Sequence, residues 1–130
     1  PNICLNMLSV EGRPEDIDAL IKFVGGNTFD LNKIIPQPDN IDMSLGATKN
    51  PLNWYNWRTK FWGTKWEAWD SIITRESPNK ATIKFITAWC PPKPVLKALA
   101  EKFKSVKITN NYYNECNDSD KEEIYNQEAK

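Results

Sequence analysis

The stretch Asn53–Asp70, which reads NWYNWRTKFWGTKWEAWD, holds five of the six tryptophans of this 130-residue chain. One buried aromatic side chain removes roughly 150 to 250 Å² of surface from water, and soluble domains seldom expose large contiguous apolar patches. A cluster this dense must therefore lie in a core, under a partner or against stacked bases. We expect the rest of the fold to be arranged around it.

The pattern here predicts a helix over Pro51–Trp62. Asn50 is a capping residue, proline suits the first helical position, and Gly63 stands where a helix commonly ends. An aromatic stripe at helical spacing usually faces a core. The aromatic residues that share one face of this helix are Trp54, Trp57 and Phe61. From Trp66 onward the alternation predicts a strand.

The tryptophans are expected to divide between core and surface. We expect the core to contain Trp54, Trp62, Trp66 and Trp89, and we expect Trp57 or Trp69 to line a groove. Arg58, Lys60 and Lys65 are interleaved with these rings. A surface that binds single-stranded nucleic acid needs such a mixture, because bases stack on rings and phosphates attract cations.

The remaining signals follow one another in a recognisable order. A strand over residues 3–10 precedes a helix over 13–24 and a long connection over 27–50, which are followed by the Trp-rich helix. Two strands, a helix and a last strand then follow over 66–75, 81–89, 95–103 and 106–113. This order predicts an α+β, ferredoxin-like split βαβ fold. Its four-stranded antiparallel sheet carries helices on one face, and the Trp-rich helix is an insertion. Residues 1–113 form one domain, with 27–65 as the insertion.

Charge is balanced overall, with seventeen basic and seventeen acidic residues, but it is unevenly distributed. Residues 1–113 carry fifteen basic and eleven acidic side chains, whereas 114–130 carry two and six. We expect 114–130 to be an acidic, flexible tail that covers a lysine-rich face; the alternative is that Ile124 and Tyr125 dock it on the domain. The candidate binding residues are Trp57, Arg58, Lys60, Lys65, Trp69, Lys93 and Lys97.

The three cysteines predict free thiols in a reducing compartment, because Cys4, Cys90 and Cys116 are spaced too widely for a metal knuckle or a redox pair. No apolar run approaches the roughly 20 residues of a membrane span, and the N-terminus lacks a signal-peptide pattern. We expect a cytoplasmic protein that does not contact membranes. The oligomeric state stays open.

The chain contains no histidine, so it lacks the usual general base near neutral pH and the commonest metal ligand. Cys90 precedes a predicted helix, a position that can lower a thiol pKa, but no histidine is present to activate it. A buried structural thiol is the favoured reading. We expect no catalytic residues, no cofactor and no metal.

Several motifs together resemble the YubB-like proteins, a family of small ferredoxin-like-domain proteins carried by phages, plasmids and bacterial genomes. The matching segments are Asn2–Asn6 with Leu8, Val10 and Gly12, Phe29–Pro36, Trp54–Arg58, Trp62–Trp66, Thr87–Pro92, and Tyr112–Tyr113. The resemblance implies the fold and a mobile-element origin, but no activity. Two departures are a cysteine at Cys90, where the family usually has serine, and the acidic tail, which replaces a glycine-containing segment.

These observations favour a non-enzymatic binding protein of mobile-element type that occupies a host protein, such as a defence component, in the host cytoplasm. The partner would then be a host or phage protein. The alternative is single-stranded nucleic-acid binding through the sheet or through the Trp/Arg groove. A third hypothesis is an enzyme that acts on a small substrate.

Overall fold

Strand β1 (Ile3–Glu11) is the central strand of a five-stranded sheet in the order β2-β3-β1-β4-β5. The computed structural model describes residues 2–115 and 119–126. β1 pairs antiparallel with β3 (Lys80–Ala88) and with β4 (Lys107–Asn114). The edges are β2 (Trp69–Ser77) and β5 (Ser119–Ile124), also antiparallel to their neighbours. The ferredoxin-like α+β fold is therefore confirmed, with one more strand than the expected four.

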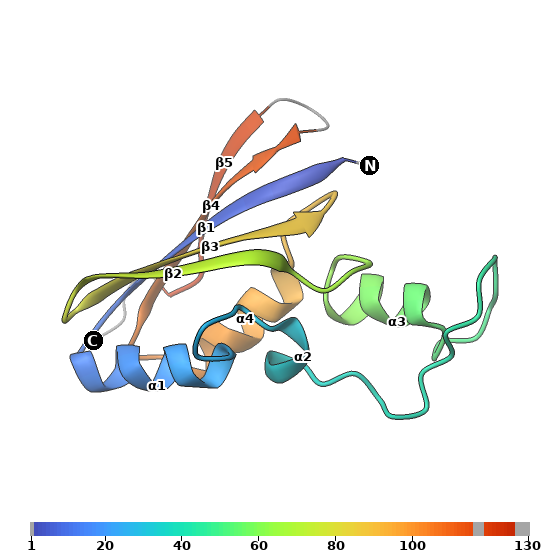
Figure 1. Ribbon diagram of the computed structural model, residues 1–130, viewed down its shortest axis with the longest axis horizontal. Helices are drawn as coiled ribbons and strands as arrows, with labels where there is room; N and C mark the ends of the chain where they lie inside the picture. Colours follow the sequence, from blue (N-terminus) through green and yellow to red (C-terminus); the bar gives the residue numbers. More distant parts are fainter. Residues whose placement is uncertain (1, 116–118, 127–130) are drawn as a thin grey trace.

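The helices lie on one side of this sheet, as Figure 1 shows. Helices α1 (Pro14–Val24) and α4 (Lys93–Lys102) cover this face, together with the short helix α2 (Leu31–Ile34). Helix α3 (Trp54–Phe61) lies beyond the end of the sheet. None of the helices in the described ranges is long and apolar enough to cross a membrane. Across residues 2–115 and 119–126, no helix covers the opposite face of the sheet.

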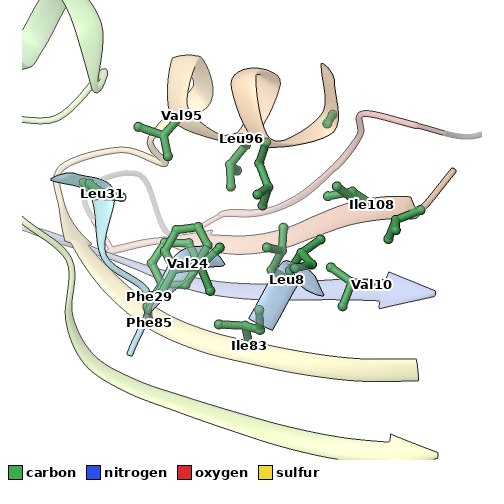
Figure 2. Close-up of a cluster of buried hydrophobic side chains, with 14 of the residues drawn as sticks. Leu8, Val10, Val24, Phe29, Leu31, Ile83, Phe85, Val95, Leu96 and Ile108 are labelled. Atoms are coloured by element: carbon green, nitrogen blue, oxygen red, sulfur yellow. The ribbon is translucent and has the colours of Figure 1, made fainter. Parts of the chain in front are cut away.

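The core lies between the sheet and the helices (Figure 2). Its central contact is the stack of Phe29 on Phe85, whose ring centroids are 4.2 Å apart. Aliphatic side chains from β1, β3, β4, α1 and α4 surround the stack, and all of them are fully buried: Leu8, Val10, Val24, Ile83, Val95, Leu96 and Ile108. Each contributes about 1.5 to 3 kcal/mol by leaving water.

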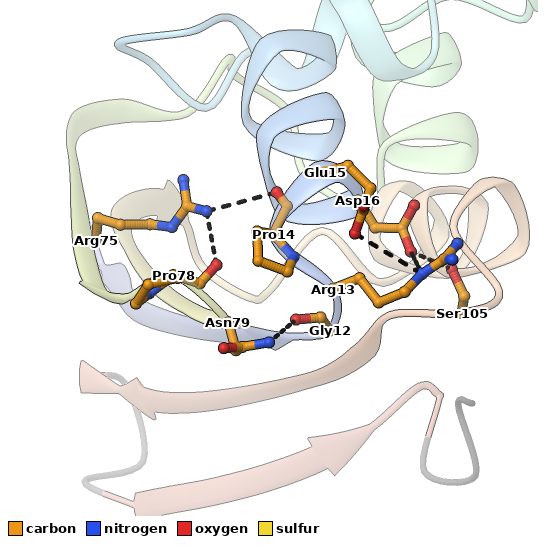
Figure 3. A network of polar contacts seen from close by, with 9 residues as sticks. All are labelled: Gly12, Arg13, Pro14, Glu15, Asp16, Arg75, Pro78, Asn79 and Ser105. Carbon is orange, nitrogen blue, oxygen red and sulfur yellow. Dashed lines mark hydrogen bonds and ion pairs between the residues drawn. The ribbon is translucent and has the colours of Figure 1, made fainter.

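A polar network fixes the β2–β3 turn to the start of α1 (Figure 3). The guanidinium of Arg75 donates to the carbonyl oxygens of Pro78 and Pro14, at 2.7 and 3.5 Å. Asn79 donates to the Gly12 carbonyl at 3.1 Å. Because these bonds go to backbone acceptors, they fix the hairpin end independently of surface salt bridges, which contribute little.

The Trp-rich helix begins three residues later than its predicted start at Pro51. Asn53, not Asn50, caps it: the buried Asn53 side chain accepts from the backbone N–H groups of Tyr55 and Asn56. A backbone bridge explains the difference. The N–H of Asp42 donates to Leu52 O and the N–H of Trp54 donates to Asp42 O, both at 2.8 Å, so Asn53 is held extended in the bridge and Pro51 and Leu52 form a turn before it.

The expected division of the tryptophans is only partly correct. Trp62 is buried as expected, whereas Trp54, also expected in the core, is half-buried and lies outside the buried cluster. Trp57, which was assigned to a groove, is buried, although it also lines a pocket with Lys60 and Phe61. Trp66 and Trp89 were assigned to the core, yet they are 37% and 41% exposed. The reason is that β2 starts at Trp69 instead of Trp66, and β3 ends at Ala88, so both exposed rings lie just outside strands.

The segment expected to be an acidic, flexible tail contains a strand. Residues 119–124 form β5, which pairs with β4 from Asn114↔Ser119 to Thr109↔Ile124. Tyr125 packs on the core and its N–H donates to Ile108 O at 2.9 Å, whereas Ile124 is 47% exposed. Backbone pairing needs no apolar side chain, so the polar composition concealed the strand. Cys116 lies outside the described residues.

The burial pattern predicts which tryptophans stabilise the fold. Trp62→Ala should cost about 3 to 5 kcal/mol, because it empties a buried site and leaves the Ile35 carbonyl without its 2.9 Å bond from the indole Nε1. Trp66→Ala should cost less than about 1 kcal/mol, as is usual at exposed sites. Urea denaturation followed by circular dichroism measures both changes. Equal losses in the two variants would contradict the assignment.

Candidate functional site

The open face of the sheet forms a concave groove with a volume of about 740 Å³. It exists because β1 alternates: Leu8 and Val10 point into the core, while Leu5 and Met7 point to the opposite face. Leu5 and Met7 are 45% and 41% exposed, and Ile72 on β2 is 60% exposed. Apolar side chains this exposed on a sheet face are typical of an interaction surface.

Strand register arranges the groove in two rows across the sheet. The first row runs Asp120, Tyr113, Leu5, Ile86 and Trp69 from β5 to β2. The second row runs Glu122, Asn111, Met7, Lys84 and Ile72. The floor is therefore mainly apolar, and charge concentrates at the two edges.

The two edges of the groove are acidic. Asp120 and Glu122 lie on β5, and Asp70 lies on β2 at a register shift where its φ is 53°. Aspartate tolerates this left-handed conformation better than most residues. Lys84 is the cation in the two rows. Lys121 also lines the groove, but it pairs with Tyr112 and so alternates toward the helix-covered face.

A second feature is an exposed aromatic cluster at the end of the sheet, made of Lys65, Trp66, Trp69 and Trp89. The Lys65 ammonium lies 4.4 Å from the Trp66 ring centroid and 4.2 Å from that of Trp89. The rings of Trp66 and Trp69 are 6.3 Å apart. This is a cation–π arrangement in which one ammonium contacts two indoles.

The Trp62–Trp66 motif holds this cluster in place by bonds to the last residue of β3 and to the segment that follows it. The Thr64 hydroxyl donates to Ala88 O at 2.7 Å, and the Cys90 thiol donates to Gly63 O at 3.0 Å. Gly63 has φ 80°, and a Cβ there would lie 2.6 Å from Pro94 Cδ. Only glycine allows this approach, which places Lys65 and Trp66 beside Trp89.

Trp89 has φ 68°, a conformation rarely adopted by a large side chain. Its N–H donates to Asn2 O at 3.1 Å, and Thr87 Oγ1 donates to Cys90 O at 2.7 Å. Strain of this kind costs about 1 to 3 kcal/mol and persists only where surrounding bonds fix it. Here it directs the indole outward.

The seven predicted binding residues do not form one surface. Arg58 lies over the Trp54 and Trp62 rings and donates to Gln37 at 2.8 Å, so it is engaged in the helix's own packing. Lys60 lies over Phe61, and Trp57 is buried. The structure places Lys65 and Trp69 together with Trp66 and Trp89, which were expected in the core. It places Trp57 and Lys60 around a separate pocket beside Phe61.

The two predicted binding residues on α4, Lys93 and Lys97, differ in their surroundings. Lys93 forms an ion pair with Glu123 of β5 at 3.2 Å, and this contact raises the lysine pKa. Lys97 is exposed. The tail therefore does reach the lysine-bearing helix, but through an ordered strand and one ion pair.

The described thiols are not activated. Burial raises the pKa of Cys4 to about 12 and also raises that of Cys90, despite the nearby Lys93. A thiol nucleophile needs the opposite shift. Within the described ranges, no group of three or more His, Cys, Asp and Glu side chains is placed to hold a metal ion.

Glu67 is a polar site that the sequence analysis did not find. Its carboxylate accepts from the N–H groups of Leu31, Asn32 and Ala68 at 2.6, 3.1 and 3.0 Å, and so fixes α2 to the start of β2. Burial, and to a smaller extent the neighbouring Asp30, raises the Glu67 pKa to about 7, although the bonds from the backbone N–H groups lower it. The contact joins residues 35 apart, so no local pattern indicates it.

The fold and the groove define an α+β domain of ferredoxin-like topology with an added edge strand. A family model described as the ferredoxin-like domain in Api92-like protein matches residues 61–128, more than half of the chain. The chain therefore belongs to this family. No curated protein and no solved structure gave a significant match.

The raised Glu67 pKa predicts a pH-dependent stability. The folded pKa of about 7 exceeds the reference value of 4.5, so the folded state binds the proton more tightly than the unfolded state does. The resulting stabilisation of the fold is fully present below pH 4.5. It is lost as pH rises through 7. Glu67→Gln cannot ionise, so the wild-type free energy of unfolding should fall relative to this variant between pH 5 and 7.5.

Urea denaturation at a series of pH values measures that difference. Glu101→Gln, a change at an exposed glutamate of α4, is the matched control and should follow the wild-type profile. Parallel profiles for wild type and Glu67→Gln would contradict the assigned shift.

Proposed function

We propose that this protein is a YubB-like, non-enzymatic binding protein of phage or plasmid origin that acts in the host cytoplasm by occupying a protein partner. A host defence component is the kind of partner that such an origin suggests. The resemblance of the N-terminal, Trp62–Trp66 and Thr87–Pro92 segments to YubB-like proteins supports the mobile-element part of the proposal.

The observation that carries the binding role is the open groove. Leu5, Met7 and Ile72 are each more than 40% exposed on one concave face, where they remain in contact with water. Covering them with a partner recovers the hydrophobic free energy that folding leaves unused. A protein surface supplies such a cover.

Charge argues for a protein partner in the groove over a nucleic acid. Asp70, Asp120 and Glu122 would face the phosphates of any strand laid across this face, opposed by Lys84 and Lys121. Nucleic-acid surfaces depend on neutralising phosphates with cations. The acidic edges therefore disfavour the sheet as a nucleic-acid platform.

Affinity capture from host lysate tests the role of the groove. Ile72→Glu places a charge on the exposed floor at an edge strand, and it should abolish capture of a protein that the wild type retains after nuclease treatment. Leu45→Glu is the matched control, because Leu45 is 88% exposed and lies outside the groove. Thermal melting confirms that both variants fold. Unchanged capture by Ile72→Glu would contradict the proposal.

A second candidate function, single-stranded nucleic-acid binding, is favoured by the exposed cluster of Lys65, Trp66 and Trp89. Two indoles and one ammonium provide stacking and phosphate attraction together. Trp89→Ala should then weaken binding of a labelled oligothymidylate by about tenfold or more. Fluorescence anisotropy measures this change, and Trp54→Ala is the control. Equal affinities of the wild type and Trp89→Ala would remove this candidate.

A further inference from the structure

We propose that the groove binds an amphipathic helix whose apolar stripe is flanked on both sides by lysine or arginine. This inference rests on the proposed function, because it names the chemistry of the partner for the same face.

The dimensions fit one helix. Adjacent strands lie about 4.8 Å apart, so the axes of β2 and β5, the outer strands of five, are separated by about 19 Å. An α-helix with its side chains is about 10 to 12 Å wide. A helix laid on the floor therefore leaves room on each side for a long side chain to reach the edge.

The floor matches an apolar stripe. Leu5 and Ile86 lie in the middle of the first row, and Met7 in the middle of the second. Methionine adapts to irregular partners, and helix-in-groove recognition uses apolar anchors at i, i+3, i+4 and i+7. These side chains lie on the face of the sheet opposite the core and remain exposed, so packing of the core does not explain their apolar character.

The edges match flanking cations. Asp120 and Glu122 lie on β5, and Asp70 lies on β2, so carboxylates occur on both sides of the floor. Lys84, in the second row next to Ile72, is the opposing charge. Complementary charge fixes orientation and excludes partners of the wrong sign. An acidic helix would face three carboxylates, whereas a basic one faces the two ammonium groups of Lys84 and Lys121.

The test uses two synthetic 18-residue helical peptides with the same leucine stripe, flanked by lysines in one and by glutamates in the other. Isothermal titration with the full chain should show binding of the lysine peptide, at least about tenfold tighter than the glutamate peptide. The difference should shrink as salt rises from 0.05 to 0.5 M, because ions screen the pairs.

Two substitutions should shift affinity in opposite directions. Glu122→Lys should weaken binding of the lysine peptide by about fivefold, and Lys84→Gln should strengthen it by about twofold, in keeping with the modest energies of exposed charge pairs. Glu101→Lys and Lys97→Gln, exposed changes on α4, are the matched controls and should leave affinity unchanged. A general loss of folding cannot produce effects of opposite sign.

The outcomes separate this inference from the proposed function. If Ile72→Glu abolishes capture from lysate but both peptides bind equally, the groove is a binding face and the basic-helix chemistry is wrong. If light scattering shows a dimer that Ile72→Glu dissociates, the occupant is a second copy of this chain. Binding of oligothymidylate that Ile72→Glu abolishes would assign the face to nucleic acid and likewise overturn the inference.

Discussion

The one-sided cover of the sheet determines most of this structure. Strand β1 is central, and both crossovers place their helices on the same side, as right-handed connections require. The Phe29–Phe85 stack and the aliphatic side chains around it fill that side. The other side is left to water by topology. The exposed apolar side chains on that side therefore belong to the surface and do not pack in the core.

The Trp-rich stretch illustrates how a dense aromatic cluster can serve two purposes. Trp57 and Trp62 pack edge to face, with ring centroids 5.6 Å apart, and attach α3 to the domain. A few residues later, Trp66 is held outward with Lys65 against Trp89. The turn at Gly63 separates the two groups. Its close approach to Pro94 explains why the chain changes from core to surface at that point.

The local distribution of charge says more about what each surface can bind than the total charge does. The chain has no formal net charge, yet the groove is acidic at both edges and the cluster around Lys65 is cationic. Part of the acidic C-terminal composition forms the β5 edge through Asp120 and Glu122, and part neutralises Lys93 through Glu123. Strand alternation causes this division, because neighbouring residues of β5 face opposite sides of the sheet.

The sequence by itself determined the fold class, the central position of β1 and the absence of histidine chemistry. Periodicity and turn residues carry this information locally. The existence and order of β2, β3 and the two framework helices also followed from such local signals, although β2 begins at Trp69 and not at Trp66. Strand β5 did not, because its stability comes from pairing with β4, and its side chains show no apolar alternation.

Only the tertiary structure decided which tryptophans are buried. A helical stripe defines a face, but it does not say which part of that face meets the core. The Asp42 bridge moved the start of α3, and the Gly63 turn together with the φ of Trp89 turned two expected core residues outward. The groove likewise depends on register between strands distant in sequence. Long-range packing and pairing set these features, and no local pattern encodes them.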